Sequence, residues 1–347
     1  MIRNQYIDNK LKNINQAVEN GIVLYGAGAN GGWCLDWCRR NEIRVLAFID
    51  SNYKMIGKNI EGIDVISYDN YKKNYSNHAI LITSKHHCKE IQENYIENNL
   101  MISFDTWFIC KNIDIYDKLE FYDDFSYKVL EKIENCMYMS DESLLYDIAE
   151  GNQYFAIAPF FNVGNEGYVD LGGYVGDTLE RFLFAHNGAY NHIWIFEPGE
   201  RQIEALEVRL KRLKKEWALD ERSISVIVGG VGNKNQTSYI SQPGNLLSMQ
   251  VVDSGGAEIR IYRLDDYFVS EEQVTFIKAD IEGSEYEMLL GAEHIIKAKK
   301  PKLALSVYHK PDDLIRIYKL LREWNLGYRF ALRHHSTMLM DTTLYCW

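Results

Sequence analysis

Short apolar segments alternate with amphipathic segments along most of this chain. Apolar runs at residues 22–25, 45–49 and 78–84 are separated by stretches in which apolar residues recur at helical spacing. The same alternation restarts at residue 167 and continues to residue 309, and a closing pair of apolar runs follows. Strands that alternate with helices build parallel sheets covered by helices on both faces. The pattern therefore predicts an α/β fold with two doubly wound domains.

The alternation is lost between about residues 105 and 155. Two segments there, 122–136 and 141–151, have apolar residues at helical spacing and predict helices that connect the domains. The predicted boundaries are a first α/β domain at 1–110, a helical connector at 111–155 and a second α/β domain at 156–347.

The composition narrows the class of protein. The chain has 347 residues, of which 46% are hydrophobic, and this is enough for two domains with a core each. The net charge of -11 disfavours a nucleic-acid partner, because nucleic-acid binding needs clustered Lys and Arg. The six cysteines form no CxxC pair, and Cys34 and Cys38, four residues apart on a predicted helix, are expected in the core. No stretch has the apolarity of a leader or a membrane span, so we expect a cytoplasmic protein.

Two glycine-rich turns lie between a strand and a helix, and the first is "IVLYGAGANGGW" at residues 22–33. Gly26, Gly28 and Gly31 form a G-x-G-x-x-G pattern. Asp50 ends the next strand, where a ribose-binding acid belongs. Because this turn contains no carboxylate, a pyrophosphate can approach the helix N-terminus without repulsion. These four residues predict a nucleotide site in the first domain.

The second turn, "YVDLGGYVGDTLERF" at residues 168–182, has acids on both sides of its glycines. Asp170 and Asp177 would repel a pyrophosphate, and they suit a ligand that carries positive charge, such as S-adenosylmethionine (SAM). Thr178 or Asp177 is expected to cap the helix. Glu197 ends the next strand, where its carboxylate can accept hydrogen bonds from both ribose hydroxyls. The predicted SAM-binding residues are Asp170, Gly172, Gly173, Gly176, Asp177, Thr178, Glu197 and Pro198.

Four segments of the second domain carry a resemblance to a known family. The segments "VDLGGYVGDT", "FEP", "FIKADIEGSEYEMLLGAEHII" and "PKLALSVYH" resemble, in order and spacing, the FkbM family of SAM-dependent methyltransferases. The resemblance spans about residues 150–347 and implies a class I methyltransferase fold, with a mainly parallel seven-stranded sheet closed by an antiparallel last strand. It also implies methyl transfer to a hydroxyl of a sugar, a glycan precursor or a natural product. The segment "IVGGVGNK" departs from many class I methyltransferases, because it lacks the acid that contacts the adenine amine.

The ends of two further strands offer groups for catalysis. Asp280 and Glu282 follow one strand and His309 ends another, so all three are expected beside the SAM turn. His309 is the preferred base for the hydroxyl proton, because imidazole titrates near neutral pH. Asp280 is the alternative base, or it orients the acceptor or the methionine ammonium, and Glu282 is either catalytic or caps the next helix. Carboxylate and imidazole are common metal ligands, but no further signal supports an ion, and no metal is predicted.

Four other residues have two interpretations each. Tyr154 and Phe155, just before the SAM turn, belong either to a lid over the cofactor or to the core. His334 and His335, in the turn of the closing hairpin, either reach the substrate or are solvated loop residues, and we expect the second.

The first domain is similar, through "YGAGANG", "AFIDSN" and "GIDVIS", to a small Rossmann-like domain that precedes some sugar acyltransferases. That resemblance implies a nucleotide or nucleotide-sugar ligand. We therefore expect a SAM-dependent O-methyltransferase that acts on a small molecule or a glycan, free or nucleotide-linked. One alternative is a NAD-dependent nucleotide-sugar oxidoreductase. The other is a methyltransferase whose first domain is only a docking module.

Overall fold

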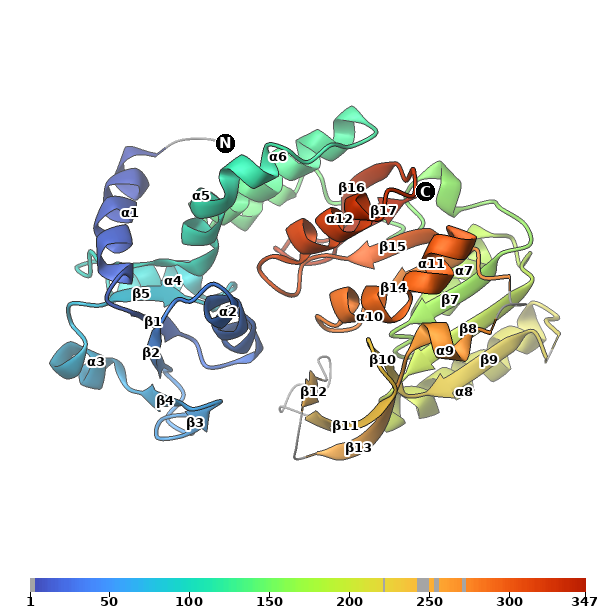
Figure 1. The fold of residues 1–347 in the computed structure, drawn as a ribbon, viewed down its shortest axis with the longest axis horizontal. Coiled ribbons are helices and arrows are strands. Elements are labelled where there is room, and N and C mark those ends of the chain that lie inside the picture. Colours follow the sequence, from blue (N-terminus) through green and yellow to red (C-terminus); the bar gives the residue numbers. More distant parts are fainter. Residues whose placement is uncertain (1–3, 221, 242–249, 253–255, 270–272) are drawn as a thin grey trace.

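The computed structural model describes residues 4–220, 222–241, 250–252, 256–269 and 273–347. Figure 1 shows one α/β domain at each end of the view, with helices of the connector above the space between them.

The first domain contains a six-stranded sheet in the order β3-β4-β2-β1-β5-β6. Neighbouring strands pair in parallel, except for β3, which is antiparallel to β4. Alternate residues of β1 pack into two different hydrophobic clusters, so this strand is buried on both faces. The strands are β1 (Ile22–Tyr25), β2 (Val45–Ile49), β3 (Asn59–Ile60), β4 (Ile63–Ile66), β5 (Ala79–Ile82) and β6 (Met101–Ser103).

Helices cover both faces of this sheet. Buried residues of α1, α2 and α5 join one cluster, whereas Tyr71 of α3 and Cys88 of α4 join the other. Cys34 and Cys38 are buried in the core, as predicted. The helices are α1 (Gln5–Val18), α2 (Ala29–Arg40), α3 (Tyr68–Asn74), α4 (Cys88–Asn94) and α5 (Phe104–Tyr116).

The connector packs against both domains. Its main helix, α6 (Asp124–Met139), contacts α5 and the sheet of the second domain. The predicted helix at 141–151 is only the short 3-10 helix η1 (Glu142–Leu145), because the chain then turns to pair Ala149 with His334 of the second sheet. One buried hydrophobic cluster runs from α1 and α2 through α6 into the second domain, so the connector ties the two cores together.

The second domain contains a seven-stranded sheet in the order β16-β17-β15-β14-β7-β8-β9. Neighbouring strands pair in parallel, except that β17 is antiparallel to β15 and to β16. The strands are β7 (Gly167–Leu171), β8 (His192–Glu197), β9 (Ile224–Val228), β14 (Phe276–Ala279), β15 (Lys302–Ser306), β16 (Phe330–His334) and β17 (Thr342–Cys346). This is the sheet that the FkbM resemblance implies, and it confirms the predicted fold class.

Helices also cover both faces of the second sheet (Figure 1). Leu179 of α7 and Leu206 of α8 pack into one cluster, and Met288 of α10 and Leu321 of α12 pack into the other. The elements are η2 (Ala158–Phe160), α7 (Asp177–Ala185), α8 (Glu200–Glu216), α9 (Leu264–Tyr267), α10 (Glu285–Gly291), α11 (Glu293–Lys299) and α12 (Asp313–Glu323). Among the described residues, no helix combines the length and apolarity that crossing a membrane requires.

A small four-stranded sheet in the order β10-β13-β11-β12 lies beside the second domain, and the sequence pattern did not predict it (Figure 1). Ile240, Ile259 and Ile261 form a hydrophobic cluster of their own within it. The strands are β10 (Gly230–Val231), β11 (Gln236–Ser241), β12 (Gln250–Val252) and β13 (Ala257–Tyr262).

Candidate active site

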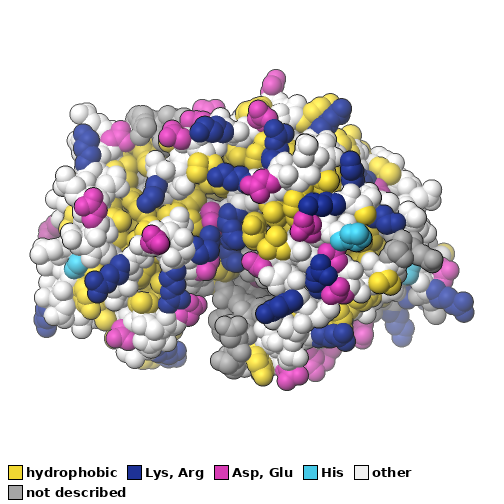
Figure 2. All heavy atoms as spheres, viewed as in Figure 1, with side chains coloured by type: hydrophobic (Ala, Val, Ile, Leu, Met, Phe, Trp, Pro, Cys, Tyr) yellow, Lys and Arg dark blue, Asp and Glu magenta, His cyan; other side chains and the backbone are white. Residues whose placement is uncertain are grey.

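A cavity of about 1160 Å³ lies between the two domains. Residues that follow β1 and β5 of the first sheet and β7, β8, β14 and β15 of the second line it, so the carboxyl ends of both sheets face one space. Figure 2 shows Lys, Arg, Asp and Glu side chains on the surface where the two lobes meet. Both glycine-rich turns border this cavity.

The first glycine-rich turn follows β1 and leads into α2. Gly26, Gly28, Gly31 and Asp50 all line the cavity. Gly31 is needed for close packing, because a Cβ atom there would lie 2.1 Å from the carbonyl oxygen of Gly26. Asp50 Oδ2 accepts a hydrogen bond from the amide of Ala27 at 2.9 Å, so this carboxylate holds the turn. The nucleotide predicted at this turn stays a prediction.

The second glycine-rich turn follows β7 and packs tightly against the rest of the domain. Gly172 has φ +79°, and a Cβ atom there would lie 1.9 Å from the carbonyl oxygen of Asp280, so only glycine fits. A Cβ atom on Gly173 would lie 2.2 Å from the side chain of Ile195. Gly172 lines the cavity, whereas Gly173 is not among the described residues that line it.

The turn ends where α7 begins. Gly176 is the N-cap residue, with φ 77°, and no side chain caps the helix. The prediction that Asp177 or Thr178 caps α7 was therefore wrong, because the left-handed conformation of Gly176 already starts the helix at Asp177. Asp177 and Thr178 instead line the cavity, and Gly176 is not among its described lining residues.

Asp170 lies beneath the second turn and not at the cavity. Its side chain is fully buried, and its Oδ1 atom forms an ion pair with Lys278 Nζ at 3.0 Å. Lys278 Nζ also donates hydrogen bonds to the carbonyl oxygens of Leu171 at 3.1 Å and Gly172 at 2.7 Å. Burial alone lowers the pKa of Lys278, but the carboxylates of Asp170 and Asp280 outweigh burial and raise it. The sequence predicted that Asp170 binds the cofactor, but the structure places it away from the cavity, where its charge pairs with Lys278.

Glu197 ends β8 and lines the cavity together with Pro198. Its Oε2 atom accepts a hydrogen bond from the amide of Tyr174, and its Oε1 atom accepts one from the amide of Gly199, both at 2.8 Å. Burial raises the pKa of Glu197, and the two hydrogen bonds oppose this effect. Each carboxylate oxygen has a second lone pair, so Glu197 can still accept hydrogen bonds from a ligand in the cavity.

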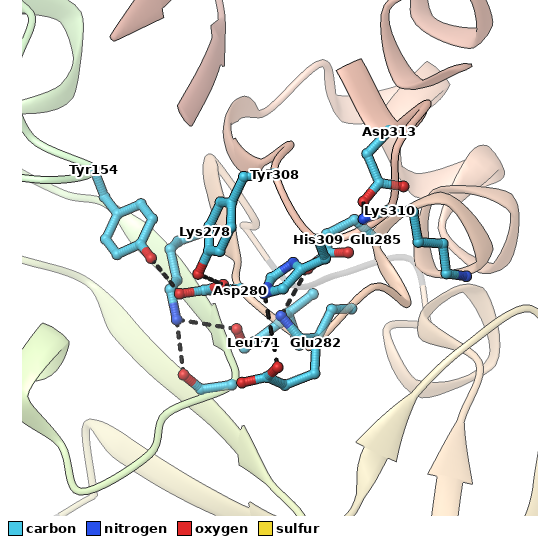
Figure 3. Close-up of polar contacts among 12 residues, drawn as sticks. Tyr154, Leu171, Lys278, Asp280, Glu282, Glu285, Tyr308, His309, Lys310 and Asp313 are labelled. Carbon is cyan, nitrogen blue, oxygen red and sulfur yellow. Dashed lines mark hydrogen bonds and ion pairs between the residues drawn. The ribbon is translucent and has the colours of Figure 1, made fainter. Parts of the chain in front are cut away.

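Asp280 follows β14 and is held by two tyrosine hydroxyl groups (Figure 3). Tyr154 donates to Asp280 Oδ2 at 2.6 Å, and Tyr308 donates to Oδ1 at 3.2 Å. Burial alone raises the pKa of Asp280, but the positive charge of His309 and further neighbours outweigh burial and lower it. Tyr154 therefore lies at the site, where it lines the cavity, whereas Phe155 packs in the core.

His309 lies among three carboxylates (Figure 3). Its Nε2 atom is 3.5 Å from Asp280 Oδ1 and 3.8 Å from Glu282 Oε2, and its Nδ1 atom is 3.2 Å from Glu285 Oε1. Burial alone lowers the pKa of His309, but the three carboxylates outweigh burial and raise it to about 10. The imidazole is therefore protonated at neutral pH, which differs from the expectation that it titrates near neutrality.

Glu282 lies in the turn between β14 and α10. It lines the cavity, and burial raises its pKa to about 7. It does not cap α10, because Ser284 is the N-cap residue of that helix and no side chain caps it. The structure thus brings the three predicted catalytic residues together, and Glu285 joins them as a residue that the sequence did not single out.

The closing hairpin does not contribute its histidines to the cavity. His334 is fully buried at the end of β16, with Nδ1 2.9 Å from Thr342 Oγ1, so the expectation that it is solvated was wrong. His335 is half-buried, and its Nδ1 atom lies 3.1 Å from the carbonyl oxygen of Glu150. Both differences arise because β16 extends through His334 and the connector packs over its end.

Two residues of the first domain contact the strand ends of the second. Trp33 of α2 packs edge-on against His309, with ring centroids 5.8 Å apart. Lys85 Nζ donates a hydrogen bond to the carbonyl oxygen of Tyr308 at 3.2 Å. Sequence reasoning missed both residues, because no local pattern indicates which side chains of one domain face the other.

Family models match both halves of the chain. Residues 170–330 match the model described as the methyltransferase FkbM domain. Residues 18–106 match the model described as C2185-like, N-terminal. The second description names no ligand, so it does not establish a Rossmann-like nucleotide domain. No curated protein matches the chain.

Solved methyltransferase structures resemble this fold. Methyltransferase FkbM from Methylobacillus flagellatus KT is 22% identical, with a TM-score of 0.60 over 99% of this chain and 95% of that chain. A putative methyltransferase from Streptococcus mutans in complex with SAH is 11% identical, with a TM-score of 0.34 over 53% and 90%. Aeropyrum pernix fibrillarin with bound SAM is 13% identical, with a TM-score of 0.32 over 53% and 67%. The first of these supports the fold along nearly the whole chain.

The match to the methyltransferase FkbM domain agrees with the strand order of the seven-stranded sheet, which is that of a class I methyltransferase. Residues 170–330 therefore form a methyltransferase FkbM domain, and the chain is a methyltransferase.

Proposed function

We propose that this methyltransferase transfers the methyl group of SAM to a hydroxyl group of a sugar, a glycan precursor or a related natural product. The common cavity is the observation that carries the proposal, because the second glycine-rich turn and the group Asp280, Glu282 and His309 line the same space. Small-molecule sites typically enclose about 300 to 1,000 Å³. A cavity of about 1160 Å³ therefore has room for the cofactor and an acceptor together.

In this proposal SAM lies along the carboxyl ends of β7 and β8. Its methionine part approaches the backbone at Gly172, where a side chain is excluded. Its ribose hydroxyls donate to Glu197, beside Pro198. Its adenine lies against Phe196 and Val231, which line the adjoining part of the cavity. Because residues 227–234 contain no acid, backbone groups and packing recognise the adenine.

The chemistry is an in-line displacement at the methyl carbon. The acceptor oxygen forms a bond to that carbon, the bond to sulfur breaks, and its electron pair goes to sulfur. Alignment of the hydroxyl supplies much of the catalysis, and a group that receives the hydroxyl proton adds to it. Asp280, Glu282 and His309 lie together at the strand ends, so we assign the orientation of the hydroxyl to them, while His309, which is already protonated, does not receive the hydroxyl proton.

The first glycine-rich turn supports an acceptor that extends toward the first domain. Gly28 precedes α2, and a Cβ atom there would meet nothing within 4 Å, so a ligand can approach this helix N-terminus. A helix N-terminus favours anionic groups. We therefore propose that a nucleotide-linked acceptor places its phosphate groups at the first turn and its sugar at the catalytic group.

Replacement of Glu197 tests the cofactor site. Glu197→Gln removes the charge that strengthens the ribose hydrogen bonds, which are worth about 1.5 to 3 kcal/mol with a charged partner. We expect SAM affinity to fall at least about tenfold by calorimetry. Glu200→Gln, on the exposed first turn of α8, is the matched control and keeps the wild-type affinity. Wild-type affinity in Glu197→Gln would contradict the ribose role.

The acceptor class is tested separately. We would incubate the protein with SAM labelled in its methyl group and with sugars, nucleotide-sugars and glycan fragments, and then locate the label by mass spectrometry. We expect an O-methyl ether. Label found only on nitrogen or carbon would refute hydroxyl transfer while leaving the SAM site intact.

A further inference from the structure

Three carboxylates surround His309, so their negative charges outnumber the single positive charge of its imidazole. Asp280, Glu282 and Glu285 approach its two ring nitrogens. Glu285 is fully buried, its Oε1 atom accepts a hydrogen bond from the amide of Ile281 at 2.8 Å, and its Oε2 atom has no hydrogen-bond partner among the described residues. Buried carboxylates are costly unless a cation or hydrogen bonds compensate them. The group therefore has capacity for a further positive charge.

The two ring nitrogens of His309 face different groups. The side chain is buried, and Nδ1 lies 3.2 Å from Glu285 Oε1. On the opposite side of the ring, Nε2 faces Asp280 and Glu282, and all three residues line the cavity. His309 thus presents one nitrogen to the cavity and the other to a buried carboxylate.

The spacing fits a metal ion. One donor atom from each of Asp280, Glu285 and His309 lies within 4.8 Å of the others, and Glu282 Oε2 is 3.8 Å from His309 Nε2. Atoms that share an ion at about 2.1 Å lie about 3 to 3.5 Å from one another. The distances of 3.5 and 3.8 Å around Nε2 need only small side-chain movements to reach that range.

The surrounding residues resemble the outer shell of a metal site. A metal-binding histidine usually donates its other ring N–H group to a carboxylate, and metal-binding carboxylates are themselves hydrogen-bonded. Glu285 lies in position to accept from Nδ1 of His309. Tyr154 and Tyr308 donate to the two oxygens of Asp280. These contacts hold Asp280 and His309 in place (Figure 3).

We propose that Asp280, Glu282 and His309 Nε2 bind at the cavity a divalent metal ion, which displaces the Nε2 proton to solvent, with Glu285 orienting His309 through Nδ1. Two carboxylates and one imidazole form a mixed oxygen and nitrogen set, for which Mn²⁺ is a suitable probe. The ion would keep open positions for the acceptor. Its role rests on the proposed function: an acceptor hydroxyl bound to the ion loses its proton to water, and the oxygen then attacks the methyl carbon while the carbon–sulfur bond breaks.

Mn²⁺ binding tests the site without an acceptor. The full-length protein is stripped with EDTA, freed of chelator and titrated with Mn²⁺, while electron paramagnetic resonance measures the unbound ion. We expect one Mn²⁺ per chain, and at least about tenfold weaker binding in Asp280→Asn and His309→Ala. Glu287→Gln, on the same helix as Glu285, is the control that keeps wild-type binding. Glu282→Gln, whose side chain borders the cavity, provides a second ligand variant if His309→Ala does not fold.

SAM calorimetry on the same samples separates this proposal from the proposed function. SAM binding without stoichiometric Mn²⁺ binding would overturn the metal site and leave the methyltransferase function standing. Mn²⁺ that binds equally well to the three ligand variants would also overturn it. Displacement of Mn²⁺ by saturating SAM would show that the carboxylates serve the positive sulfonium instead, and this outcome too would refute the proposal.

Discussion

Replacement of Lys278 tests how the second glycine-rich turn is stabilised. Lys278 forms a fully buried ion pair with Asp170 at 3.0 Å and donates to the carbonyl oxygens of Leu171 and Gly172. Lys278→Met keeps most of the side-chain volume but removes the charge and all three contacts. Asp170 then remains in the core of the domain without a counter-charge.

The expected loss of stability follows from that uncompensated charge. Removal of one partner from a buried ion pair costs about 3 to 5 kcal/mol. Because globular proteins are stable by about 5 to 15 kcal/mol, the variant should lose about a fifth or more of its free energy of unfolding. The double variant Asp170→Asn/Lys278→Met contains neither charge and should recover most of this loss. The two carbonyl groups without their donor account for the remainder, at about 1 kcal/mol each.

Urea unfolding of the wild type, Asp170→Asn, Lys278→Met and the double variant measures the free energy of coupling between Asp170 and Lys278. SAM calorimetry on the double variant then isolates the carbonyl contacts, and we expect weaker binding because Gly172 has lost its donor. If Lys278→Met were as stable as the wild type, Lys278 would not be needed to compensate the buried charge of Asp170. If the double variant were as unstable as Lys278→Met, the lost stability would come from the carbonyl contacts of the turn and not from the uncompensated charge.

Two further predictions concern the first domain and the connector. Gly31→Ala should destabilise the protein by about 2 kcal/mol or more in urea unfolding, since its Cβ atom would lie 2.1 Å from the carbonyl oxygen of Gly26. Gly28→Ala should leave stability unchanged, and equal losses in both variants would contradict this description of the turn. Burial raises the pKa of Glu134 in α6 from its ordinary 4.5 to about 7, so the folded state binds more protons than the unfolded state between these values, and stability falls as the pH rises through them. Glu134→Gln should therefore add about 2 kcal/mol at pH 8 and little at pH 4, and an equal gain at both pH values would refute the assignment.

The main sheets were predictable because their strands are buried on both faces and read as continuous apolar runs, such as Ile22–Tyr25 in β1 and residues 193–196 in β8. The small sheet was missed for the opposite reason. In β13, Ile259 and Ile261 alternate with the exposed residue Arg260, and six residues of this kind resemble a loop as much as a strand. Its partner strands are also short, so no repeated pattern marks the insertion.

The glycines and Glu197 were predictable because local geometry demands them, whereas the partners of Asp170 and His309 were not. An acid beside a glycine-rich turn indicates a charged ligand only if no other side chain neutralises it. Lys278 lies more than a hundred residues away in the sequence, and only the pairing of β7 with β14 brings it under the turn. Glu285 shares that difficulty, since its helix must fold back before the carboxylate reaches the imidazole.

Contacts between the domains bring the two glycine-rich turns to one cavity. Arg40 of α2 forms a bidentate ion pair with Asp312, with Nη1 to Oδ2 at 2.7 Å and Nη2 to Oδ1 at 3.1 Å. Trp33 of the same helix packs against His309. The helix that begins at the first turn is therefore fixed against the strand ends of the second sheet, and its N-terminus opens into the cavity that also borders the SAM turn. Trp33 and Lys85 add contacts to His309 and Tyr308 at the ends of the second sheet. The first domain therefore forms one wall of the cavity that the second glycine-rich turn also borders.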